Sequence, residues 1–254
     1  MRIRRIIQTI TAIIGLTACI TTHASTIDSL KQLLPKQEGQ QLQKTYNILA
    51  REYAQQGFVS EALDIYNRLI DLDQQLGTEQ HESNHRYNQL AVLYYYHQFD
   101  SLREAINEHK PWFEHHQKWE EYFYSWKLLA DSYYMTGKIQ TALRESEKMI
   151  EDAKQRDSDF GRSQALIEMG QIYMGMEQHD EAIEAYRRAI ELLKNMDGEN
   201  HNVCLAYLRM CESLDRKKDY QQEERVCAEW KKYLDSWASQ SENGEEAIYS
   251  YYTD

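Results

Sequence analysis

One short motif recurs along the chain about every 40 residues, a period typical of helical solenoids. In each copy a hydrophobic residue precedes a small residue, and a large side chain, usually tyrosine, follows three positions later. The small residues are Ala50, Ala91, Ala130, Gly170 and Cys211. After each motif comes a turn and then a second apolar stretch with helical spacing. The repeat therefore predicts an all-α chain built from antiparallel helix pairs.

The small residues explain how the two helices of a pair come close together. Ala50 on the first helix is expected to face Ala62 on the second, where two large side chains would hold the helix axes apart. Tyr53 and Tyr66 then fill the space beside this contact, because apolar residues three and four positions apart lie on one stripe. A single pair cannot bury its stripe alone, so the pairs must stack on one another.

Composition supports long helices and argues against one class of partner. The chain has 254 residues, of which only 10 are glycine and 2 are proline, fewer than strands joined by tight turns usually need. The formal net charge is -12, and binding of phosphate backbones needs clustered lysine and arginine. Nucleic acid is therefore excluded as an expected partner.

The motifs resemble the tetratricopeptide repeat family over residues 43–237. In the third repeat the matching residues are Trp126, Leu129, Ala130, Tyr133, Gly137 and Ala142. The repeats are longer than the family's usual length of about 34 residues, and two close-contact positions hold Leu102 and Glu223 in place of alanine. The resemblance implies a right-handed α-solenoid of five helix pairs that binds a protein or peptide, without a cofactor, a metal or a catalytic site.

The same resemblance implies where a partner would bind. In this family the first helix of each repeat lines a concave groove. Aromatic, methionine and arginine side chains with a few amides suit an extended peptide or a helix. The matching positions are Asn47, Arg51, Asn88, Tyr95, Tyr124, Lys127, Tyr134 and Met174.

The first 24 residues have the order of a secretory signal, with a basic start, an apolar stretch and then small residues. Cleavage after Ala24 would give a mature chain that begins at Ser25. A second interpretation is a bacterial lipobox, Leu16-Thr17-Ala18-Cys19, in which Cys19 becomes the lipidated first residue. Both interpretations predict export to the extracytoplasmic side of a bacterial membrane.

Two further segments flank the repeats. Residues 25–42 are expected to form an N-terminal capping helix, and residues 238–254 a turn and the start of a truncated sixth repeat. An exported repeat array of this kind resembles the periplasmic sensor region of bacterial histidine kinases that contain tetratricopeptide repeats. That resemblance implies a signalling role and a membrane helix in a missing downstream part; the alternative is a free or lipid-anchored scaffold in envelope assembly.

Two local patterns raise other chemistry. The segment His81-Glu82-Ser83-Asn84-His85 fits the H-E-x-x-H pattern, which on a helix places two zinc ligands beside a general base. Its polar neighbours favour a solvated helix start, with His81 outside the helix or on its surface, so a zinc hydrolase is only a remote alternative. The family resemblance also brings Cys211 and Cys227 near each other, as a candidate disulfide in an exported chain.

Overall fold

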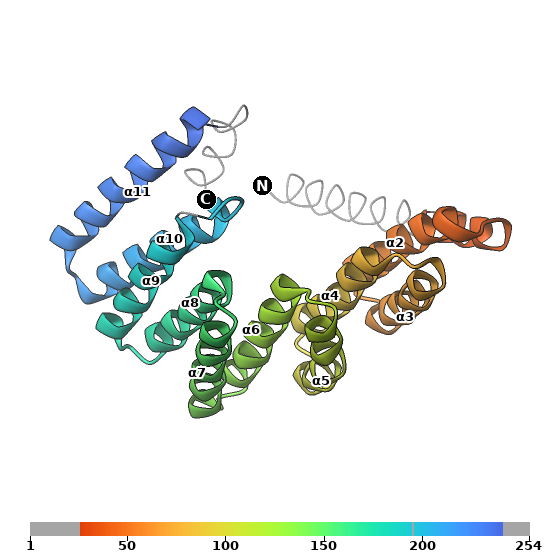
Figure 1. Cartoon of the computed structure of the whole chain (residues 1–254), viewed down its shortest axis with the longest axis horizontal. Coiled ribbons are helices and arrows are strands. Elements are labelled where there is room, and N and C mark those ends of the chain that lie inside the picture. The colour runs from red at the N-terminus through yellow and green to blue at the C-terminus, as the bar shows by residue number, and fades with distance from the viewer. Residues whose placement is uncertain (1–25, 195, 241–254) are drawn as a thin grey trace, which may run out of the picture. The chain divides into compact units, whose positions relative to one another are not determined.

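The computed structural model describes residues 26–194 and 196–240 (Figure 1). The signal segment and the truncated sixth repeat lie outside the described residues, apart from residues 238–240 at the end of the last helix. The described residues contain helices and turns and no strand. None of the described helices is long and apolar enough to cross a membrane.

The helices follow one another as pairs, each joined by a short turn (Figure 1). Residues 26–33 form a first short helix, followed by a 3-10 turn at Leu34–Lys36. The pairs are α2 (Gly39–Gln55) with α3 (Val59–Leu76), α4 (Glu79–Tyr95) with α5 (Phe99–His115), α6 (Trp119–Met135) with α7 (Ile139–Gln155), α8 (Asp159–Gly175) with α9 (His179–Leu193), and α10 (Asn200–Lys217) with α11 (Tyr220–Gln240). The predicted fold of antiparallel helix pairs is confirmed.

The chain divides into two compact units, Met1–His109 and Lys110–Asp254, and each is described by itself. The division falls inside α5, next to Pro111. A proline within a helix has no N–H to donate to the carbonyl four residues earlier, here that of Asn107, and its ring crowds that carbonyl. The helix is therefore locally weakened where the two units join.

Small residues close the helix pairs as the repeat predicts. In three of the pairs, small residues are fully buried where the two helices touch, and a larger buried residue takes that place on α5. These are Ala50 with Ala62, Ala130 with Ala142, Gly170 with Ala182, and Leu102 on α5. Burial of these positions shows that the helices pack on the faces read from the sequence.

Helix α8 is packed especially tightly on both of its sides. A Cβ atom added to Gly161 would lie 2.5 Å from the Phe123 ring of α6, and one added to Gly170 would lie 2.6 Å from the Tyr186 ring of α9. Both rings are fully buried. Glycine is therefore required at these two positions by the close approach of aromatic rings.

The same helix buries two polar side chains that have no hydrogen-bond partner among the described residues, Gln164 and Glu168. Burial raises the pKa of Glu168 to about 8; the negative charge of Asp131 adds to this effect, and the positive charge of Lys127 opposes it. The carboxyl group is therefore mostly protonated at neutral pH.

Candidate functional site

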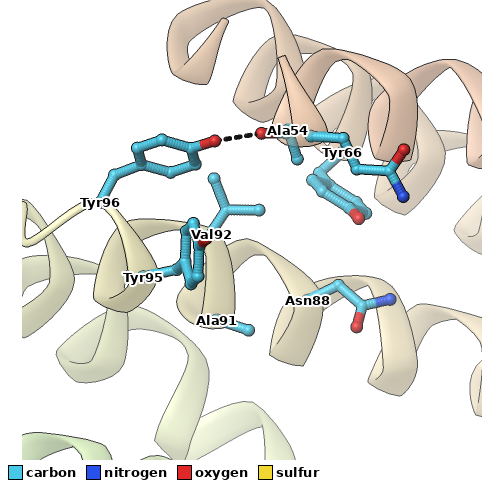
Figure 2. A pocket seen from close by; sticks show the side chains of 8 residues that line it. Ala54, Tyr66, Asn88, Ala91, Val92, Tyr95 and Tyr96 are labelled. Carbon is cyan, nitrogen blue, oxygen red and sulfur yellow. Dashed lines mark hydrogen bonds between the residues drawn. The ribbon is translucent and has the colours of Figure 1, made fainter. Parts of the chain in front are cut away.

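An apolar cavity of about 430 Å³ opens in the first unit, between α2, α3 and α4 (Figure 2). Its wall combines aromatic rings and small aliphatic side chains with two amides. The lining residues are Ala54, Gln55, Tyr66, Asn88, Ala91, Val92, Tyr95 and Tyr96. Concave, largely apolar cavities with a few polar groups are the usual form of binding sites.

The tyrosines of this cavity have different roles. Tyr96 donates a hydrogen bond from its hydroxyl group to the carbonyl oxygen of Ala54, which ties the end of α4 to α2 (Figure 2). Tyr66 is buried, and this burial raises the pKa of its hydroxyl group while the charge of Arg51 opposes the shift. Tyr95 is 71% exposed and packs edge-on against Tyr96. Tyr95 is thus the ring that remains available to a partner.

A second cavity, of about 370 Å³, adjoins the first and is polar. Asn88 lines both cavities, and we refer to the two together, along α2 and α4, as the α2–α4 groove. The polar cavity is lined by Gln43, Lys44, Asn47, His81, Asn84, His85 and Asn88. It carries one lysine, two imidazoles and four amides, and no carboxylate.

A buried carboxylate holds the floor of the polar end in place. Asp73 of α3 is fully buried and accepts hydrogen bonds from Gln43 Nε2 (2.5 Å), Thr78 Oγ1 (2.9 Å) and His85 Nδ1 (2.6 Å). Three donors on one carboxylate compensate for its removal from water. The network joins α2, α3 and α4 directly beneath the groove.

The H-E-x-x-H segment lies wholly within α4, so the suggestion that His81 precedes the helix is wrong. His81 is exposed, but Glu82 and His85 are buried, and the interpretation as a solvated helix start fails for them. These two side chains are buried with hydrogen-bond partners, since His85 bonds to Asp73 and Glu82 to Arg86. The local sequence does not reveal the Asp73 partner, because it lies on another helix. The Glu82 carboxylate is bound by Arg86 at 2.7 and 3.0 Å and so is not a free base.

Three of the predicted groove residues meet in the first unit. Asn47 and Asn88 line the polar cavity, and Asn88 and Tyr95 line the apolar one. Arg51 is exposed on α2, outside the lining of both cavities.

The predicted groove residues of the second unit make contacts with other side chains of that unit. The Tyr124 hydroxyl group accepts a hydrogen bond from Asn202 Nδ2 at 3.2 Å, and the Tyr124 ring meets the Phe160 ring edge-on. Met174 packs against a core formed by α8, α9, α10 and α11, and the positive charge of Lys127 opposes the rise that burial causes in the pKa of Glu168. Tyr134 is half-buried and lies close to Gly175.

Sequence reasoning missed most of the polar end of the groove. Gln43 lies four residues before Asn47, and Asn84 and His81 lie four and seven residues before Asn88, so each pair shares a helix face. That spacing was the available signal. The role of Tyr66 was assigned only to packing, although its ring also lines the apolar cavity.

The candidate disulfide pair lies within one helix pair, as the resemblance implies. The Sγ atoms of Cys211 on α10 and Cys227 on α11 are 3.4 Å apart, and both cysteines are free in this structure. Burial raises the pKa of the Cys211 thiol, and the neighbouring Cys227 raises it further. Formation of the bond stays a prediction.

Comparison with known proteins places these repeats. Residues 163–196 match the tetratricopeptide repeat family, and residues 44–73 match the PPR repeat family. No curated protein matches the sequence significantly. Solved structures share the fold at low sequence identity.

The first is BtubC from P. vanneervenii, with a TM-score of 0.58 and 14% identity over 85% of this chain and 90% of that one. The second is apo RapI, with a TM-score of 0.59 and 12% identity over 87% of this chain and 61% of RapI. The third is NprR in complex with its cognate peptide NprX, with a TM-score of 0.53 and 18% identity over 91% of this chain and 71% of that one. The chain therefore shares the helical-repeat fold of these structures, and part of it matches the tetratricopeptide repeat family.

Proposed function

We propose that the chain binds a short peptide in the α2–α4 groove. The observation that carries this proposal is that an apolar, tyrosine-lined cavity and a cavity lined by polar side chains share the residue Asn88. An apolar side chain of the peptide would pack on Tyr95, which is 71% exposed. The amides of Asn47, Asn84 and Asn88 would meet its main chain, because an amide side chain both donates and accepts hydrogen bonds.

The groove has a length that fits such a ligand. His81 and Tyr95 lie near opposite ends of α4, and fourteen helical steps of about 1.5 Å separate them by roughly 21 Å. An extended chain rises about 3.3 Å per residue, so six or seven residues would span the groove. The peptide complex of the structurally similar NprR supports a peptide as the ligand class.

A random-peptide library displayed on phage and selected on the immobilised full chain tests this proposal. We expect enriched peptides with an apolar or aromatic residue, and we expect Tyr95→Ala to weaken their binding by about 2 kcal/mol, or roughly thirtyfold. Fluorescence anisotropy with labelled synthetic peptides measures the affinity. Tyr95 is too exposed to support the core, so thermal stability should not change.

Two tyrosine variants serve as controls. Tyr220→Ala removes another exposed tyrosine, 60% exposed and remote in sequence from the groove, and should leave binding intact. Tyr134→Ala tests whether the second unit contributes to peptide binding. It should lower the affinity much less than Tyr95→Ala does. Selection of no peptide, or equal binding by wild type and Tyr95→Ala, would contradict the proposal.

We also propose that the protein works outside the cytoplasm, as the peptide-sensing part of a signalling protein. The support is the signal-like order of residues 1–24 together with a binding fold. Expression in a bacterium should give a mature chain that begins at Ser25, measured by N-terminal sequencing. A lipidated Cys19 at the mature start would favour a lipid-anchored scaffold, and a retained Met1 would refute export.

A further inference from the structure

Two histidines stand on one face of α4 at the polar end of the groove. His81 and His85 are four residues apart, line the same cavity of about 370 Å³, and have ring centroids 6.4 Å apart. Residues four apart on a helix lie one above the other, so both imidazoles reach the same volume of solvent. Although His85 is buried and His81 exposed, both line this one cavity, and two imidazoles four residues apart on a helix are a recurrent arrangement for metal chelation.

The orientation of His85 leaves the correct atom available. Its Nδ1 atom lies 2.6 Å from Oδ2 of Asp73, and a carboxylate can only accept, so Nδ1 carries the proton. In the neutral ring the Nε2 atom then keeps its lone pair, on the side of the ring away from Asp73. A carboxylate that fixes a histidine tautomer in this way is the usual support of a metal-binding imidazole.

The distance between the rings is at the upper limit for a shared ion. A metal–nitrogen bond of about 2.0–2.1 Å places the ion roughly 3.2 Å from each ring centroid, so centroids 6.4 Å apart would need the two nitrogens on opposite sides of the ion, and a tetrahedral site requires the rings to come closer. His81 is exposed, and rotation of its side chain brings the two rings nearer to a tetrahedral angle at the ion.

We infer that His81 and His85 bind a divalent transition-metal ion of the class that prefers imidazole nitrogen, such as Zn²⁺ or Ni²⁺. No group of three or more His, Cys, Asp and Glu side chains converges within the described part of the chain, so water or a bound ligand completes the coordination. Lys44 lines the same cavity and opposes a cation, while the buried Asp73 favours one. This inference differs from the expectation, made from the sequence, that the chain holds no metal.

The site would bind metal without hydrolytic chemistry. Glu82, the general base of the H-E-x-x-H pattern, is buried and held by Arg86 and Gln74, and it does not line the cavity. A metal ion there would add positive charge to the polar end of the groove. A carboxylate or imidazole of a bound peptide could then occupy the coordination positions that the two histidines leave open.

Calorimetric titration of the untagged full chain with Zn²⁺ and with Ni²⁺, in the absence of peptide, tests the inference. Wild type should show one saturable site, and His81→Ala should lower its affinity at least about tenfold while the circular dichroism spectrum is unchanged. The metal should also raise the melting temperature of wild type and not that of His81→Ala. His115→Ala removes another exposed histidine, beside His116, and should bind metal as wild type does.

Asp73→Asn tests the supporting carboxylate, since loss of such a partner lowers metal affinity about 10–100-fold with both imidazoles still present. If that variant fails to fold, His81→Ala carries the test alone because its side chain is exposed. Absence of saturable binding to wild type, or equal affinity in His81→Ala, would overturn the site. Because no peptide is used, these results are independent of the test of peptide binding.

Discussion

Glu168→Leu is expected to stabilise the second unit by about 3–5 kcal/mol at pH 8, and far less at pH 5. The carboxyl group is fully buried without a hydrogen-bond partner among the described residues, and burial raises its pKa from 4.5 to about 8. Each unit of pKa shift corresponds to about 1.4 kcal/mol between the protonation states. The expected gain in the free energy of unfolding arises because Glu168 must either hold its proton above its ordinary pKa or carry a charge inside the core. Leucine at this position has neither cost.

The sign of the pH dependence follows from which state binds the proton. Between pH 4.5 and 8 the folded protein keeps the Glu168 proton and the unfolded chain releases it, so the stability of wild type falls as pH rises through this window. The charge of Asp131 on α6 adds to the raised pKa of Glu168, and the charge of Lys127 on the same helix opposes it. Burial raises the pKa of Tyr186 of α9, and the negative charge of Glu168 adds to that shift. Both Glu168→Leu and Glu168→Gln should remove this fall.

Urea unfolding followed by tryptophan fluorescence at pH 5 and pH 8 measures the effect. All five tryptophans, at positions 112, 119, 126, 230 and 237, belong to the second unit, so the signal reports on that unit alone. The control is Glu184→Gln, an exposed residue on α9, which should change neither stability nor its pH dependence. A fall in stability between pH 5 and pH 8 that persists in Glu168→Gln would assign it to another group.

Gly170→Leu is expected to destabilise the same unit by about 3 kcal/mol or more, the upper range for overpacking a core. Even the first side-chain atom would lie 2.6 Å from Cε1 and 2.8 Å from Cζ of Tyr186, whose ring is fully buried and has no free space to move into. Gly170→Ala should also destabilise, although alanine is the better helix former by about 1 kcal/mol.

A matched control lies on the same helix. At Gly175 an added Cβ would meet only the hydroxyl end of Tyr134, a half-buried side chain that can rotate away. Gly175→Ala should therefore be neutral or slightly stabilising in the same urea experiment. Equal stability of Gly170→Ala and Gly175→Ala would show that α8 and α9 do not approach as closely as described.

The fold was predictable because its determinant is local and periodic. Each helix pair carries its own small residues, such as Ala50 with Ala62, and stacking is the only way to bury the stripe beside them. The apolar end of the groove was partly predictable for the same reason, since Tyr95 occupies a position defined by the repeat.

The polar end of the groove depends on contacts that no period encodes. Asp73 and His85 are separated by 12 positions and lie on different helices, and their bond becomes visible only once α3 and α4 are packed. In the same way, the hydrogen bond from Asn202 to the Tyr124 hydroxyl group joins residues 78 positions apart, so the sequence did not indicate it. Helical spacing predicts the face of the helix on which a side chain lies. It does not predict which residue of another helix that side chain contacts.

The boundary inside α5 bears on how the chain folds while it is being synthesised. Contacts in a repeat array are made between neighbours, so residues up to His109 have all the partners of the first unit once that segment has left the ribosome. Pro111 lies just beyond this point and cannot donate a backbone hydrogen bond within α5. The first unit, which carries the α2–α4 groove, can thus reach its native packing before the second has been translated.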